Sequence, residues 1–239
     1  MINLIRGEAI KMRSTRTAIG FTIAGVALTL LVVLVSTLAD EPSTVSAKRD
    51  AITVAPIFVL FVVFGVVGAT GEYRHRTVAP AVLIAPDRLR LLSARALAYA
   101  VTAAGVALVM LVVSFAIGIP LMAGNEGEAL AFADYAGLLG GGLLSAALGG
   151  MLGVGFGALV GNQVAGVVSV LVYLFVVDGL IGVAKSDLIP YTIGTAAPAL
   201  GGLNIDEAFG FLGSLGVLAA WTLLFMGLGL LRESRREVT

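Results

Sequence analysis

The chain has 239 residues, of which 59% are hydrophobic and 13% charged, and its formal net charge is zero. Ordinary soluble domains carry about 25% charged residues. This composition, with a mean hydropathy of +1.04, therefore excludes a typical soluble domain and indicates a membrane protein. The absence of cysteine excludes disulfides and thiolate metal sites.

The first 16 residues carry apolar side chains at helical spacing, with charged side chains largely on the other side. The apolar positions are Ile2, Ile5, Ala9 and Met12. This pattern predicts a short amphipathic elbow helix over residues 1–16 that lies in the membrane interface. A frayed basic tail is the alternative.

Six apolar runs follow, at residues 17–39, 51–70, 94–120, 136–160, 164–184 and 210–231. Each is near or above the roughly 20 residues that a membrane span needs, and a backbone in lipid must satisfy its own hydrogen bonds as a helix. The first run exceeds the roughly 7–15 residues of a signal-peptide core, so we interpret it as a retained span. The sequence predicts an all-α polytopic protein with six transmembrane helices in one domain, residues 1–239.

Basic residues are distributed unevenly between the segments that connect these runs. Twelve of the 15 Lys and Arg residues fall in residues 1–16, 71–95 and 232–236. The three exceptions are Lys48, Arg49 and Lys185. Because positive residues stay cytoplasmic, we expect both termini and the 71–95 segment to be cytoplasmic in a multi-pass protein of the plasma (inner) membrane.

Small residues recur every four positions along the fourth run. They are Gly137, Gly141, Ser145, Gly149, Gly153, Gly157 and Gly161. Such stripes let helix backbones approach closely in lipid. We expect Gly149, Gly153, Gly157 and Gly161 to pack either inside the chain or at a subunit interface. Residues spaced by four rotate slowly around a helix, so the whole stripe cannot contact a single neighbouring helix.

The connection between the fifth and sixth runs, residues 185–209, is apolar but interrupted by Pro190, Pro198 and several glycines. Its pieces are too short to span a membrane. We expect short re-entrant helices buried against protein. A plain external loop is the alternative.

Sequence motifs for catalysis are absent. The sequence contains no G-x-x-x-x-G-K-[ST] phosphate-binding loop, and its single histidine, His75, lies outside the apolar runs. We therefore expect no enzyme activity, no catalytic residues and no metal site in this chain. Asp178 is the only acid deep in a run, so it is a candidate for the translocation path. A structural hydrogen bond or a shallow ion pair with Lys185 is the alternative.

The 71–95 segment is the longest charged stretch of the chain, and it holds two candidate roles. One is a basic loop that binds anionic lipid headgroups. The other is a short helix along the membrane, broken at Pro86-Asp87 before the next span. Such a helix would offer a docking surface to a partner protein outside the membrane.

The stretches E-Y-R-H-R-T-V and L-I-A-P-D-R in this segment resemble the region after the second span in bacterial ABC-2 type (type V exporter) ABC transporter permeases. Glu72, Thr77, Leu83, Pro86 and Arg88 match the family pattern, whereas Arg76 stands where the family has glycine. The elbow, the six spans and the re-entrant pieces extend the resemblance over nearly the whole chain.

The resemblance implies an export permease without its own ATPase. It implies a coupling helix that seats in a separate ABC ATPase subunit, which binds the ATP and magnesium and makes the whole complex an ATP-hydrolysing translocase. The implied coupling residues are Glu72, Tyr73, Arg74, His75, Arg76, Thr77, Pro86 and Arg88. It also implies a dimer with a second permease copy or a paralogous permease.

Other functions remain open at this point. A secondary transporter or channel without an ATPase partner is the main alternative, and it would favour paired intramembrane charges. An assembly or sensor subunit is a further one. The apolar spans favour a hydrophobic or amphipathic substrate. We expect membrane lipid, and no nucleic acid, among the partners.

Overall fold

The computed structural model describes residues 16–39, 41–75 and 88–235. Within these ranges all regular secondary structure is helical, and six helical segments are long and apolar enough to cross a membrane. The predictions of an all-helical fold and of six helices able to span a membrane are therefore confirmed. The elbow predicted at residues 1–16 lies outside the described residues, apart from the last of them.

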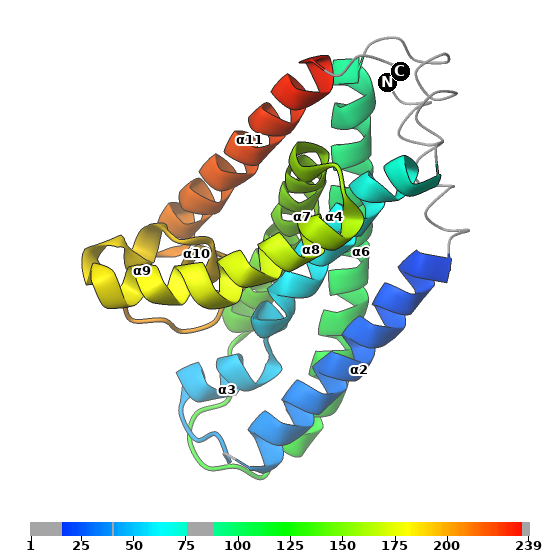
Figure 1. Ribbon diagram of the computed structural model, residues 1–239. Coiled ribbons are helices and arrows are strands. Elements are labelled where there is room, and N and C mark those ends of the chain that lie inside the picture. The colour runs from blue at the N-terminus through cyan, green and yellow to red at the C-terminus, as the bar shows by residue number, and fades with distance from the viewer. Residues whose placement is uncertain (1–15, 40, 76–87, 236–239) are drawn as a thin grey trace.

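The helices form one bundle whose long members run in alternate directions (Figure 1). In chain order they are α2 (Arg16–Leu38), α3 (Val45–Ile52), the 3-10 helix η1 (Ala55–Ile57), α4 (Phe58–His75), α6 (Arg88–Leu121), α7 (Phe132–Val160), α8 (Gln163–Val172), the π-helix η2 (Tyr173–Val177), α9 (Asp178–Ala184), the 3-10 helix η3 (Ser186–Tyr191), α10 (Ile193–Leu200) and α11 (Phe211–Arg235).

The second span differs from its prediction. The sequence predicts one helix over residues 51–70, but α3 ends at Ile52 and the helix resumes only at η1 and α4. Pro56 lies in the first turn of η1, and proline does not fit the interior of a helix because it lacks a backbone donor. At the break the Thr53 hydroxyl accepts from the Ala55 N–H at 3.1 Å. Lys48, Arg49 and Asp50, which precede the predicted span, therefore lie in a helix of their own.

Helix α6 is longer than the predicted span at residues 94–120, because it begins at Arg88. Its 34 residues extend about 51 Å at 1.5 Å per residue, against a hydrocarbon core of about 30 Å. Residues 88–93, which lie before the predicted span and include Arg88 and Arg90, are in fact helical. One end of α6 therefore projects beyond the apolar part of the bundle.

Helices α4 and α7 form the centre of the bundle, and α6 and α11 also pack against α7. Gly65 of α4 faces the Gly150–Val154 backbone of α7, where a side chain at Gly65 would collide with the facing helix. Gly149 lies against Phe58, and Gly153 and Gly157 lie against the Val62 and Val66 turns of α4. Small residues thus let two central helices approach closely and gain van der Waals contact.

The fifth span leaves the bundle. Its α8 part packs against α4, whereas its α9 part contacts η3 rather than the central helices. Only 11% of its most apolar window is buried, against 67% for the span that contains α4. Figure 1 shows α8 and α9 crossing the bundle and extending away from it. Most of this span therefore faces the surroundings of the chain.

Candidate functional site

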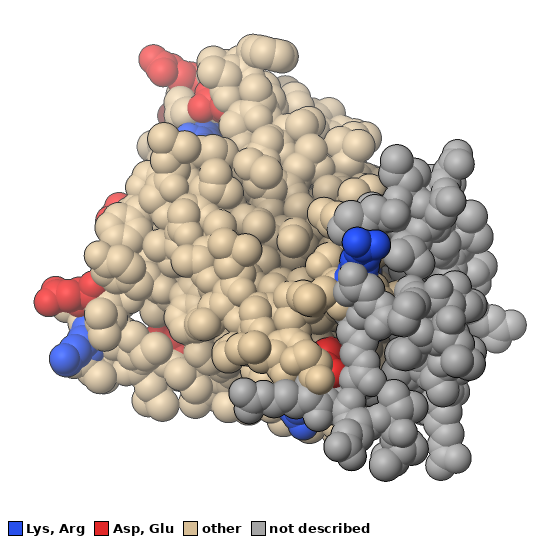
Figure 2. Space-filling view, turned by 90° about the horizontal axis from the view of Figure 1, so that it is seen from above, with Lys and Arg blue, Asp and Glu red and all other residues tan. Residues whose placement is uncertain are grey.

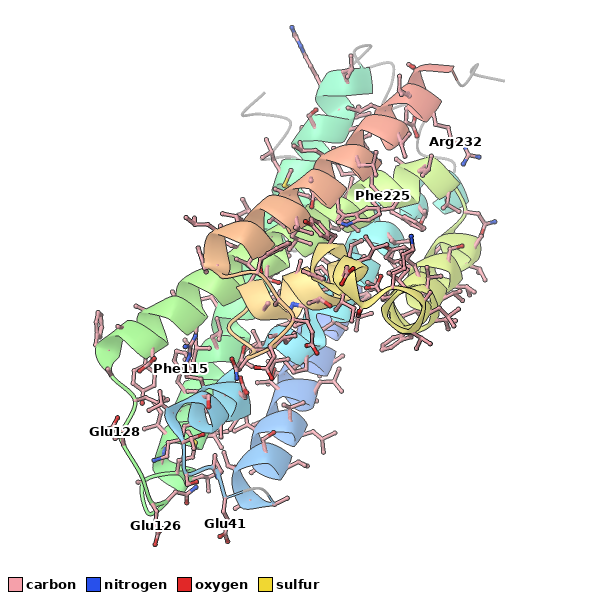
Figure 3. All side chains as sticks on the ribbon, turned by 90° about the vertical axis from the view of Figure 1, so that its left-hand side faces the viewer. Glu41, Phe115, Glu126, Glu128, Phe225 and Arg232 are labelled. Atoms are coloured by element: carbon pink, nitrogen blue, oxygen red, sulfur yellow. The ribbon has the colours of Figure 1, made fainter. Side chains whose placement is uncertain are left out.

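The two ends of the bundle differ in charge. At one end α4 and α7 end and α6 begins; we call it the basic end, after the exposed Arg90 and Arg232. At the opposite, acidic end lie the exposed Glu41, Glu126 and Glu128, far from Arg232 in Figure 3. In the view from above, most of the described surface is uncharged, and the few charged side chains lie toward its margins (Figure 2). This distribution is the one expected of a chain oriented in a membrane by its basic residues.

The predicted coupling residues divide between described and undescribed parts of the chain. Glu72, Tyr73, Arg74 and His75 form the last turn of α4, and Arg88 begins α6. Arg76, Thr77 and Pro86 lie outside the described residues. The helices that border the predicted coupling segment thus both point to the basic end (Figure 1).

Arg95 does not belong with the exposed residues of this end, since only 6% of it is exposed. It lies more than one turn inside α6, beside the buried Leu92 and Ala96. Of the basic residues assigned to the 71–95 segment, Arg95 is therefore part of the helix packing.

A groove of about 720 Å³ opens at the basic end, between α4 and the tight turn that joins α7 to α8. Gly161 makes this turn with a φ of 70°, in the left-handed region that glycine adopts at helix C-termini. Asn162 begins α8 by accepting a hydrogen bond from the Ala165 N–H at 3.1 Å. Gly161 is thus a turn residue, unlike the other three glycines predicted to pack.

Helix α3 ties together the connections at the acidic end through three consecutive charged residues. Lys48 donates to the carbonyls of Gly127 and Glu128, at 3.4 and 3.1 Å. Arg49 lies 3.9 Å from Asp134 at the start of α7. Asp50 accepts from the Asn204 N–H at 2.9 Å. One short helix therefore fixes the α6–α7 connection and the α10–α11 connection.

Buried hydroxyl groups add to these tertiary bonds. Thr53 donates to the Gly201 carbonyl at 2.8 Å, and Ser114 of α6 donates to the Ile52 carbonyl at 2.6 Å. Ser145 of α7 donates to the Ala197 carbonyl of α10 at 2.9 Å. The Ile52 and Gly201 carbonyls lie at helix ends, where backbone groups lack partners within the helix, whereas the Ala197 carbonyl also accepts the Gly201 N–H. The small-residue stripe of α7 thus faces α10 near Ser145 and α4 from Gly149 onward.

Asp178 lies where the fifth span changes from a π-helix to α9. Its carboxylate accepts a hydrogen bond from the backbone N–H of Gly194, in the first turn of α10. A carboxylate in this position satisfies an N–H group that has no partner within the helix. The observed partner is therefore the short helix between the fifth and sixth spans, rather than Lys185.

Aromatic residues surround this contact. The Tyr173 hydroxyl lies beside the Asp178 carboxyl, and its ring packs against Trp221 with centroids 5.9 Å apart. The Trp221 indole N–H donates to the Tyr191 carbonyl at 2.8 Å. Three segments, η2, η3 and α11, thus meet around Asp178.

Sequence reasoning identified Asp178 but missed Tyr173, Gly194 and Trp221. In an α-helix Tyr173 and Asp178, five residues apart, would point about 140° away from each other. The i→i+5 bonding of η2 brings them onto the same side. No local sequence signal marks a π-helix here, so the proximity of Tyr173 and Asp178 could not be predicted and depends on how the fifth span packs.

No protein-family model matches this chain, and no curated protein matches it.

Proposed function

We propose that this chain is the membrane-spanning permease subunit of an ATP-driven ABC exporter. A separate ATPase subunit would dock at the basic end on the segment between α4 and α6. The substrate class is hydrophobic or amphipathic, and a second permease, identical or paralogous, would complete the transport unit. The proposal rests on the resemblance of residues 72–88 and on the position of the helices that border them.

The observation that carries the proposal is the continuity of α6. It runs unbroken from Arg88 at the basic end to Leu121 at the acidic end, and it packs on α7 and α2 along the way. Near its far end Ser114 bonds the Ile52 carbonyl at the end of α3. A displacement of the Arg88 end by a partner would therefore reach the acidic end along one stiff element.

The experiment is purification of the chain from its native membranes in mild detergent, with identification of bound proteins and an assay of ATP hydrolysis. We expect a P-loop ATPase to co-purify with the wild-type chain. Glu72→Ala or Arg74→Ala should reduce both its recovery and the hydrolysis. Arg232→Ala, which changes an exposed arginine of the same end, is the matched control and should leave both unchanged. Recovery of the pure chain without an ATPase contradicts the proposal.

A secondary transporter is the second candidate, and one observation favours it. Asp178 lies in a membrane span next to a π-helix, a feature that often occurs at functional sites. Transport by the purified chain in vesicles without ATP, lost in Asp178→Asn, would favour this candidate over the exporter.

A further inference from the structure

A small polar cavity lies at the acidic end, between α3 and the turn that follows α10. Its volume is about 100 Å³, and its polar lining comes from Ser46, Arg49, Asp50 and Asn204. Ser46 and Asn204 are exposed, so the cavity opens to the outside of the protein. A water molecule takes about 30 Å³ of liquid volume, so the open space has room for the polar groups of a small headgroup, and its charged lining does not suit an apolar chain.

The cavity contains a cation and an anion side by side. Asp50 is held in place because its Oδ1 accepts the Asn204 N–H at 2.9 Å. That bond leaves Oδ2 for another donor. The carboxylate is therefore both fixed and able to bind a second group.

Arg49 has a bonding capacity that the described protein does not use. Its Nε is buried and has no hydrogen-bond partner, and the closest carboxylate oxygen, Oδ1 of Asp134, is 3.9 Å away. Buried donors are nearly always paired. The buried Nε itself is out of reach of a ligand, but 37% of the Arg49 side chain is exposed, and guanidinium groups bind phosphate and carboxylate oxygens with particular strength.

The position of the cavity, at the start of a membrane-spanning segment, indicates that such a ligand is a membrane lipid. Ser46, Arg49 and Asp50 belong to α3, which directly precedes the apolar residues of η1 and α4. The change from charged to apolar residues is typical of the depth where lipid headgroups lie. A headgroup could enter the open cavity while its acyl chains remain along the uncharged surface.

We propose that this cavity binds the phosphoethanolamine headgroup of a membrane lipid. The phosphate accepts from Arg49 and from the Ser46 hydroxyl, and the primary ammonium donates to Asp50. A choline group has no N–H to donate to Asp50. A glycerol headgroup brings no cation to Asp50. The lipid would link α3 to the α10–α11 turn, in addition to the Asp50–Asn204 bond.

The test is native mass spectrometry of the purified full chain with phosphatidylethanolamine, phosphatidylcholine and phosphatidylglycerol of identical acyl chains. We expect one phosphatidylethanolamine per chain to be retained at least about tenfold more tightly than either of the others, which corresponds to one strong charged contact. Equal retention of phosphatidylethanolamine and phosphatidylcholine by the wild-type chain overturns the proposal, and this comparison needs no variant.

Two variants test whether the preference for phosphatidylethanolamine arises at this cavity. Asp50→Asn keeps an oxygen that can accept from Asn204, so the fold is preserved while the preference for the ammonium headgroup should vanish. Arg49→Gln should weaken the specific binding of phosphatidylethanolamine. Asp206→Asn, which neutralises an exposed acid of the neighbouring turn, is the matched control and should leave the preference intact. A preference that survives Asp50→Asn overturns the assignment.

Free O-phosphoethanolamine distinguishes a lipid site from a site for a soluble zwitterion. We expect it to displace the lipid only at concentrations far above that of the lipid, because it lacks the contacts of the acyl chains. Displacement at equal concentration would overturn the lipid as the natural ligand. All of these outcomes are independent of whether an ATPase binds the chain.

Discussion

The carboxylate of Asp178 accepts a hydrogen bond from the backbone N–H of Gly194, so the acid of the fifth span is attached to the first turn of α10. The α9 part of the fifth span otherwise contacts η2 and η3 rather than the central helices. This bond is therefore one of the few that fix the outer half of the span in place. It gives Asp178 a structural role that can be separated from transport.

Replacing Asp178 by alanine should destabilise the protein. The Gly194 N–H would lose its acceptor, and a hydrogen bond to a charged group contributes about 1.5–3 kcal/mol. Asp178→Asn should cost less, since the amide oxygen can still accept. Thermal unfolding in detergent, followed by circular dichroism, measures both. If Asp178→Asn abolishes transport at unchanged stability, the charge has a role of its own.

Gly194→Ala should have an effect similar to that of Asp178→Ala. A Cβ at this position would collide with the Asp178 carboxylate, so the acid would have to move away from the helix terminus. Gly216→Ala serves as the control, because a Cβ there meets nothing within 4 Å. Equal melting temperatures for the two variants would argue against a tight contact between α9 and α10.

Gly153→Val should disrupt the packing of α4 on α7. An added Cβ would lie 3.0 Å from the Gly65 Cα and closer still to the Val62 carbonyl, and overpacking of this kind costs about 1–3 kcal/mol or more. Gly137→Val changes the same helix where a Cβ meets nothing within 4 Å. Both valines carry the same helix propensity, so the difference in the yield and melting temperature of the two variants measures the contact alone.

Thr53→Val should reveal the contribution of the bond across the break in the second span. The substitution leaves the Gly201 carbonyl and the Ala55 N–H without their partner, at a cost of about 1–3 kcal/mol. Thr22→Val is the control, because the Thr22 hydroxyl only adds a bond to the Ala18 carbonyl within its own helix, at 2.9 Å. A change in melting temperature no larger than that of the control would show that the break tolerates an unpaired carbonyl.

The orientation can be tested with single cysteines, because the chain contains none. Glu126→Cys at the acidic end should react with a membrane-impermeant maleimide on intact cells. Arg232→Cys at the basic end should react only after the membrane is permeabilised. Both side chains are exposed, so access to the reagent depends on the side of the membrane. The reverse pattern of labelling would place the basic end outside and remove the coupling proposal.

The sequence by itself determined the number of spans, their helical nature and the charge difference between the two ends. Length and apolarity are sufficient for this, because a backbone in lipid has no other way to satisfy its hydrogen bonds. The regular glycine spacing of α7 likewise predicted close packing, and the drift of that stripe predicted more than one neighbour.

Only the tertiary structure decided which groups meet. The Thr53–Gly201 bond at the break, the contacts of Lys48, Arg49 and Asp50 in α3, and the pairing of Asp178 with Gly194 all join residues that are distant in sequence. Hydropathy carries no information about such pairs, because they depend on where unpaired backbone groups at helix ends come together. The polar cavity beside Arg49 has the same origin, since Ser46, Arg49 and Asp50 come from α3 and Asn204 comes from the α10–α11 connection, and only the folded bundle brings these two segments together.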